Sequence, residues 1–261
     1  MATRRIAMKK TLMIIVALLV FVLPLSAYSV NALRSSDARQ IKLEQSSKLI
    51  HTNQKKWRKH IAKADVIHSD EFANQSTSVS TSLEQLQNHS QTVIQGTVYN
   101  LQKMHSPEGM SYTKATIYVD RVISGDESIK DKNIYLALDG GLVSYDCWYA
   151  KNIGKNMDPK HEILVQNDEF PLPTIGSKVI TGLVPNHLNE TNAYNTALKQ
   201  SGFTINNSYA IDNPQYDFWV KKPKATKYQL NNPKLRKFTS NQRTKQLQKL
   251  TVLINQKYNK K

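Results

Sequence analysis

The pattern that most constrains the fold of this chain is the alternation of apolar and polar side chains in the segment from Tyr112 to Val122. A period of two is typical of a β-strand with one face buried in a core. The sequence therefore predicts a strand here. Its buried face would carry Ala115, Ile117 and Val119, and its other face Lys114, Thr116, Tyr118 and Asp120.

Other short segments also favour strands, and turn residues separate them. These segments are 92–99, 134–138, 178–184, 209–211 and 216–220. Gly96 within the first indicates a bulge or a close backbone approach, and Gly140-Gly141 indicates a tight turn that needs positive φ. Strands and helices do not alternate as they would in a parallel sheet. We therefore expect an α+β protein built on a small antiparallel β-barrel or sandwich.

Amphipathic helices are predicted on both sides of the β-rich region. Before it, Leu43, Ile50, Trp57, Ile61 and Ala64 recur at spacings of seven, seven, four and three residues, which places them on one helical face. After it, Asn232-Pro233 suits a helix start, and the apolar positions that follow at helical spacing are Leu235, Phe238, Leu247, Leu250, Ile254 and Tyr258. Shorter helices are expected at 82–86 and 188–200.

The start of the chain is typical of an exported protein. Arg4, Arg5, Lys9 and Lys10 precede an apolar run over residues 12–25, and Val30-Asn31-Ala32 fits a cleavage site. Two interpretations are open: a cleaved signal peptide over 1–32, or an uncleaved membrane anchor. In both, the remainder lies outside the cytoplasm, so an extracellular or cell-surface location is expected.

These patterns divide the chain into five segments. They are the signal or anchor (1–32), a basic helical arm (33–68), a polar Ser/Thr-rich linker (69–82), a β-rich domain (83–220) and a basic helical tail (221–261).

The only cysteine, Cys147, cannot form a disulfide within the chain, so stability must come from an apolar core. We expect Cys147 to be a small buried hydrophobic residue. The alternative is a reactive nucleophile paired with His161.

Charge is distributed unevenly along the chain. The net charge is +4 over residues 1–32, +7 over 33–63, −8 over 64–217 and +13 over 218–261. A tail with no acid attracts polyanions, which outside a cell means anionic wall polymers or lipid headgroups. The residues predicted to bind such a surface are Lys221, Lys222, Lys224, Lys227, Arg236, Lys237, Arg243, Lys245 and Lys249. Two alternatives are open. The tail docks on the acidic middle of its own chain, or its positive charge only keeps the protein soluble.

No catalytic, metal-binding or cofactor-binding motif is present, so no residue is assigned to those roles and no cofactor is expected. The seven histidines lack zinc-hydrolase spacing, and no Gly-x-Ser-x-Gly or Ser-x-x-Lys occurs. The aromatic cluster Tyr145, Trp148 and Tyr149 would form either part of the core or a stacking pocket.

The leading hypothesis is an exported, non-enzymatic protein held at an anionic envelope by its basic arms, with a protein partner also open. The alternatives are a secreted hydrolase with a site between Asp139 and Trp148, and a secreted nucleic-acid-binding protein. The latter is disfavoured because few aromatics are interleaved with the tail cations.

The β-rich region also resembles a group of known proteins. The segments concerned are Leu-Glu-Gln-Leu (83–86), Val-Ile-Gln-Gly-Thr-Val (93–98), the strand and turn from Tyr112 to Asp126, Gly140-Gly141 and Ile175 to Ile180. Their order over residues 83–220 resembles uncharacterised secreted Gram-positive proteins with a small β-barrel-like domain. The resemblance implies a barrel fold and supplies no catalytic residue.

Overall fold

The computed structural model describes residues 43–69, 79–150, 158–237 and 241–259. The chain divides into two compact units, Met1–Leu49 and Ile50–Lys261, and the second is described below. The predicted signal or anchor over 1–32 lies outside the described residues. Among the helices in the described ranges, none combines the length and the apolar character that crossing a membrane requires.

Five strands form a closed barrel, which confirms the predicted α+β fold with a β-barrel. They are β2 (Thr92–Lys103), β3 (Tyr112–Ser124), β4 (Asn133–Asp139), β7 (Lys178–Pro185) and β8 (Ser208–Ile211). Neighbours pair antiparallel except β4 and β8, which are parallel, and the β7–β8 pairing closes the ring. Around the barrel the strands lie in the order β2, β3, β4, β8 and β7, so the fifth of them in the chain lies between the third and the fourth. This is the Greek-key order of the OB-fold, and it carries no function by itself.

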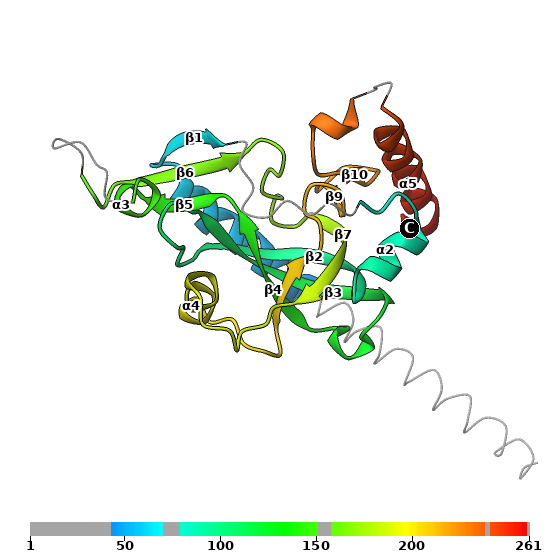
Figure 1. Ribbon diagram of the computed structural model, residues 1–261, viewed down its shortest axis with the longest axis horizontal. Helices are drawn as coiled ribbons and strands as arrows, with labels where there is room; N and C mark the ends of the chain where they lie inside the picture. The colour runs from blue at the N-terminus through cyan, green and yellow to red at the C-terminus, as the bar shows by residue number, and fades with distance from the viewer. Residues whose placement is uncertain (1–42, 70–78, 151–157, 238–240, 260–261) are drawn as a thin grey trace, which may run out of the picture. The chain divides into compact units, whose positions relative to one another are not determined.

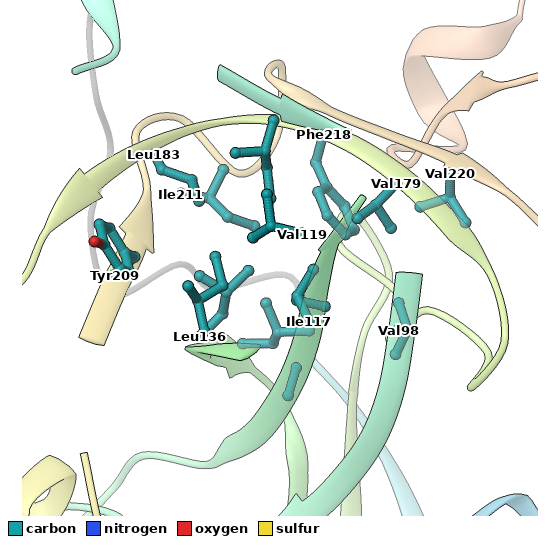
Figure 2. Packing of buried hydrophobic residues seen from close by; sticks show 14 of the residues in the cluster. Val98, Ile117, Val119, Leu136, Val179, Leu183, Tyr209, Ile211, Phe218 and Val220 are labelled. Carbon is teal, nitrogen blue, oxygen red and sulfur yellow. The ribbon is translucent and has the colours of Figure 1, made fainter. Parts of the chain in front are cut away.

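The barrel interior holds the main apolar core (Figure 2). Figure 2 shows Val98, Ile117, Val119 and Leu136 in one cluster with Val179 and Phe218, and all six side chains are buried. The predicted alternation in β3 is confirmed, because Ala115, Ile117 and Val119 are all fully buried.

Gly96 bends β2 at a register shift, as its position predicted. A Cβ there would lie 2.7 Å from Ile117 Cγ2 and 2.8 Å from the Tyr118 carbonyl oxygen, so only glycine allows the two strands to approach this closely.

A second sheet follows β4 directly. It has three strands in the order β1 (Asp65–Ser69), β6 (Glu162–Asn167) and β5 (Gly141–Ser144), with β1 and β6 parallel. The chain passes from β4 into β5 through Gly140 and Gly141, whose φ values of 86° and 131° confirm the predicted turn. A Cβ on Gly141 would lie 1.9 Å from Thr113 Oγ1.

The carboxy-terminal segments extend the barrel sheet and cover it. Strand β9 (Phe218–Lys221) pairs with β7, and β10 (Gln229–Leu230) pairs with β9. Helix α5 (Gln242–Tyr258) lies close to α2 (Leu83–His89) at one side of the barrel (Figure 1). Four α5 residues pack into a second apolar cluster with Leu86, Ile180 and Trp219; they are Leu247, Leu250, Ile254 and Tyr258.

The remaining short elements are η1 (Glu127–Ile129), α3 (Tyr145–Trp148), α4 (Ala193–Gln200) and η2 (Lys234–Arg236). Asn232-Pro233 does precede a helix, but that helix is the short η2, whose N-cap is Pro233; the Asn232 side chain accepts from Lys234 N at 3.0 Å. Helix α5 begins separately after Asn241, whose side chain accepts from Thr244 N. The helix expected over 188–200 begins at residue 193, because Asn192 is its N-cap.

A helix spans residues 43–61. From Ile50 onward it packs on the barrel through two residues of the predicted stripe, Ile50 and Trp57. Asn53, which interrupts that stripe, is buried. Its Nδ2 donates to the Tyr99 carbonyl oxygen at 2.9 Å, which satisfies the buried amide.

Candidate functional site

Four of the cations predicted to bind a surface line one cavity. Lys222, Lys224, Lys227 and Arg236 surround a space of about 560 Å³, and residues 171–174 form another part of its wall. No aspartate or glutamate of the described residues lines this space. We call it the basic groove; its composition suits an anionic ligand.

The turn between β9 and β10 positions the three lysines. It begins at Lys222, whose carbonyl oxygen accepts a hydrogen bond from Ala225 N at 2.9 Å. Lys224 within it has φ of 70°, in the left-handed region. The hairpin is anchored by the pairing of Val220 with Gln229, so the lysines project from a fixed base.

Arg236 is held in place by neutral oxygens, two of them main-chain carbonyls, rather than by an acid. Its Nε donates to the Leu230 carbonyl oxygen at 2.5 Å, one terminal nitrogen donates to the Asn231 carbonyl oxygen at 2.7 Å, and the other to Gln229 Oε1 at 3.3 Å. Partial burial lowers the pKa of Arg236. A guanidinium has five N–H donors, so two are left for a ligand.

The positive charge of the tail is largely uncompensated. Lys234 pairs with Glu169 at 3.0 Å, and among the described residues it is the only tail cation in an ion pair with a carboxylate. Helix α5 docks through apolar packing and neutral hydrogen bonds, for example from Trp219 Nε1 to Thr251 Oγ1 at 2.9 Å. The tail therefore docks on its own domain, but in the described part of the chain only Lys234 of its cations is paired with an acid.

The other five predicted cations lie away from the groove. Lys221 Nζ donates to Asn259 Oδ1 at 2.8 Å and lies 5.1 Å from the centroid of the Tyr228 ring. Four more are exposed outside the groove lining: Lys237 after η2, and Arg243, Lys245 and Lys249 on α5.

The predicted aromatic cluster separates into two environments. Tyr145 stacks on Tyr149 and on His161, with centroids 5.4 and 5.2 Å apart. Trp148 instead lines a cavity of about 270 Å³, and Asp139 lines it as well. Neither Tyr145 nor Tyr149 lines that cavity, and a stacking pocket shared by the three aromatic residues stays a prediction.

Cys147 has the surroundings of a structural thiol. It packs beside Val143 and Ile163, and its Sγ lies 3.5 Å from the carbonyl oxygens of Ser106 and Pro107. Burial, and then the nearby acids Asp146 and Glu108, raises the pKa of this thiol. A raised pKa disfavours the thiolate that a nucleophile needs.

His161 is engaged elsewhere. Its Nε2 lies 2.8 Å from Asp65 Oδ2, so the imidazole joins β1 to the start of β6 instead of activating Cys147.

Asp139 at the end of β4 lines a second and larger cavity, of about 560 Å³. We call it the Asp139 cavity. Burial raises the pKa of Asp139 to about 6. Burial, and then the charge of Asp139, raises the pKa of Tyr194 to about 12 and raises that of Tyr112 still further. Both phenols are therefore neutral at physiological pH.

The hydrolase alternative requires titratable side chains that converge on one cavity, and the Asp139 cavity provides two carboxyl groups. Asp212 also lines it, and burial raises the pKa of this second carboxyl. Within the described ranges, the lining residues include no serine, threonine, cysteine or histidine. Asp146 is used structurally, because its carboxylate accepts hydrogen bonds from Ser144 Oγ and from Cys147 N. A catalytic site between Asp139 and Trp148 remains a prediction.

Sequence reasoning did not identify the walls of either cavity. The groove combines residues 171–174 with residues 222–236, and the Asp139 cavity combines Tyr112, Tyr194 and Asp212. The only local signal was Pro171-Leu172-Pro173, which indicates an ordered loop but not a ligand site.

Comparison of this chain with protein families, with characterised proteins and with solved structures found no match. The resemblance to secreted Gram-positive proteins therefore stays a prediction, and the functional argument depends on the geometry of the chain itself.

Proposed function

We propose that this protein is an exported, non-enzymatic domain that stays at the cell surface by binding an anionic envelope polymer in its basic groove. The convergence of Lys222, Lys224, Lys227 and Arg236 on one cavity without an acid carries the proposal. The predicted export signal over 1–32 supplies the compartment in which such a polymer occurs.

The composition of the groove favours a ligand that is recognised by charge rather than by aromatic stacking. Its lining, as far as the chain is described, holds lysines, an arginine, prolines and small polar residues, with no phenylalanine, tyrosine or tryptophan. Binding of single-stranded nucleic acid usually combines cations with aromatic platforms for the bases. A repeating phosphate or carboxylate polymer needs only the cations and the two remaining guanidinium donors.

Two matched charge-reversal variants test whether the groove, rather than net charge, holds the polymer. One replaces Lys222, Lys224 and Lys227 with glutamate, and the other replaces the exposed α5 residues Arg243, Lys245 and Lys249 with glutamate. Both change the net charge equally, and both alter exposed side chains. Binding to isolated envelope is measured by sedimentation across a salt series.

The groove variant should lose most of its binding, whereas the α5 variant should retain most of it. Binding by the unmodified protein should weaken steeply with salt, because the Debye length falls from about 10 Å at 0.1 M to about 3 Å at 1 M. Equal losses in the two variants would show that only overall charge matters. Unchanged binding by the groove variant would refute the proposal.

The binding material distinguishes the two possible sources of the anion, a wall polymer and lipid headgroups. Purified wall polymer, and vesicles containing an anionic phospholipid, are tested against the same two variants. Groove-dependent binding to the wall polymer alone supports our proposal. Groove-dependent binding to the vesicles alone would assign the groove to lipid headgroups instead.

Export is tested independently. A reporter fused after residue 40 should be delivered outside the cell, and Leu18→Arg should prevent this by breaking the apolar run. A reporter that stays in the cytoplasm with the intact run would remove the compartment on which the proposal depends.

A further inference from the structure

The carboxylate of Asp139 has no partner in the part of the chain that the structure describes. Its backbone pairs with Tyr112 between β4 and β3, but no hydrogen bond or ion pair reaches its side chain from any described residue. The carboxyl nevertheless borders both the Asp139 cavity and the smaller cavity lined by Trp148. Asp139 is half-buried, and an unpaired carboxylate that is partly shielded from water is costly, so a bound counter-charge would stabilise it.

The walls of the Asp139 cavity suit an organic cation. Tyr112 and Tyr194 both line it and meet edge to face, with ring centroids 5.3 Å apart. Met110 and Pro214 add apolar surface, and Asp212 adds a second acid. Aromatic faces attract cations, and apolar walls accept the carbon body of a ligand.

Among the residues that the structure describes, the chain supplies no cation of its own to this site. Although its net charge is +16, no lysine, arginine or histidine is among the residues that line the Asp139 cavity. The nearby Lys114 is engaged elsewhere: its Nζ lies 3.8 Å from the centroid of the Tyr135 ring and donates to the Ser201 carbonyl oxygen at 2.7 Å. A volume of about 560 Å³ lies within the usual range for small-molecule sites.

We propose that the Asp139 cavity binds a small organic ammonium ion, with the ammonium group against the Asp139 carboxylate and the carbon body against Tyr112 and Tyr194. This site is chemically opposite to the basic groove and shares no lining residue with it. The inference therefore holds or fails independently of the proposed envelope binding.

Benzylammonium and its neutral analogue benzyl alcohol are suitable probes. Titration of the full chain is followed by calorimetry and by NMR chemical shifts. Benzylammonium should bind saturably and perturb residues of the Asp139 cavity. Benzyl alcohol, which lacks the charge, should bind about tenfold more weakly or worse, since a charge-assisted hydrogen bond is lost.

Asp139→Asn tests the carboxylate, and Glu127→Gln is its control, because it removes the same charge from an exposed position. Benzylammonium affinity should fall about tenfold or more in the first variant and stay unchanged in the second. Equal affinity of Asp139→Asn and the unmodified chain would overturn the proposal. So would equal affinities for the ammonium and the alcohol, which would indicate a merely apolar cavity.

A pH series on the unmodified chain gives a second test that needs no variant. The probe stays charged between pH 5 and pH 8, whereas the pKa of Asp139 is about 6. The other titratable groups that line the cavity are Tyr112, Tyr194 and Asp212. His89 and Asp217 lie outside the lining and interact with Asp212. The phenols stay neutral over this range, so benzylammonium should bind more weakly at pH 5 than at pH 8. Constant affinity would contradict the role of the carboxylate.

Discussion

Asp217 is a fully buried carboxyl whose charge should limit the stability of this protein. Its residue is 0% exposed, its Oδ2 accepts from Ser80 Oγ at 3.3 Å, and its Oδ1 has no partner among the described residues. Burial, followed by the charge of Asp212, raises the pKa of Asp217 to about 7 from its ordinary 3.8. Replacing this residue with asparagine removes the charge while keeping the shape.

The sign of the effect follows from proton linkage. The folded-state pKa lies above the unfolded one, so the folded state binds more protons between pH 3.8 and about 7. The contribution of protonated Asp217 to stability is therefore complete below the unfolded-state pKa of 3.8, and it is lost as the pH rises through the folded-state pKa of about 7. A difference of about 3 pKa units corresponds to about 4 kcal/mol at most, at about 1.4 kcal/mol per unit.

The expected gain for Asp217→Asn is smaller than that limit. Water penetration and relaxation reduce the cost of the buried charge, and the new amide brings donors that need partners. We expect the variant to be about 1–3 kcal/mol more stable than the unmodified chain at pH 8. At pH 4 the two should be nearly equal.

Urea denaturation of both proteins from pH 4 to pH 8 measures this difference. Asp126→Asn is the control, because hydrogen bonds from Ser128 lower the pKa of that exposed carboxyl. Its loss should therefore slightly destabilise the protein above pH 4. The difference in free energy of unfolding between Asp217→Asn and the unmodified chain should grow with pH. If it does not, ionisation of Asp217 does not destabilise the folded state, and the reasoning is wrong.

Three further substitutions test the packing. Ile117→Ala should lower the free energy of unfolding by about 2–5 kcal/mol, because this side chain is fully buried, whereas Thr116→Ala on the other face should cost much less; equal costs in urea denaturation would contradict the alternation. Gly141→Ala should destabilise the protein by more than 1 kcal/mol, roughly, because φ is 131° and the added Cβ would meet a hydroxyl on β3; an unchanged melting temperature would contradict this strain. Leu250→Ala should lower the free energy of unfolding by about 2–5 kcal/mol, because Leu250 is fully buried. Val252→Ala should lower it much less, because Val252 is 55% exposed. Equal values would show that α5 does not dock as described.

Local sequence patterns predicted the elements whose periodicity is strict. The β3 alternation places Ile117 in the core because successive side chains of a strand point to opposite faces whatever the strand pairs with. Glycine positions were predictable for a similar reason, since Gly140 and Gly141 adopt backbone angles that other residues avoid.

Strands without alternation were missed. In β6, Ile163, Leu164 and Val165 are all buried, so no polar face marks the segment as a strand. In β1, Val66 and Ile67 lie at the end of a basic helical segment, and they form a strand only because β6 provides the edge with which they pair.

The sequence by itself thus determined which segments alternate, which turns need glycine, and how the charge divides between the middle of the chain and its tail. Tertiary structure alone decided which of those charges act together. Lys222 and Arg236 meet beside residues 171–174, and Asp139 meets Tyr194 across a cavity, because β7, β8 and β9 fold these distant segments onto one barrel. Hydrogen bonds between strands set these neighbours, and a local pattern of side chains carries no information about which edge a strand will join.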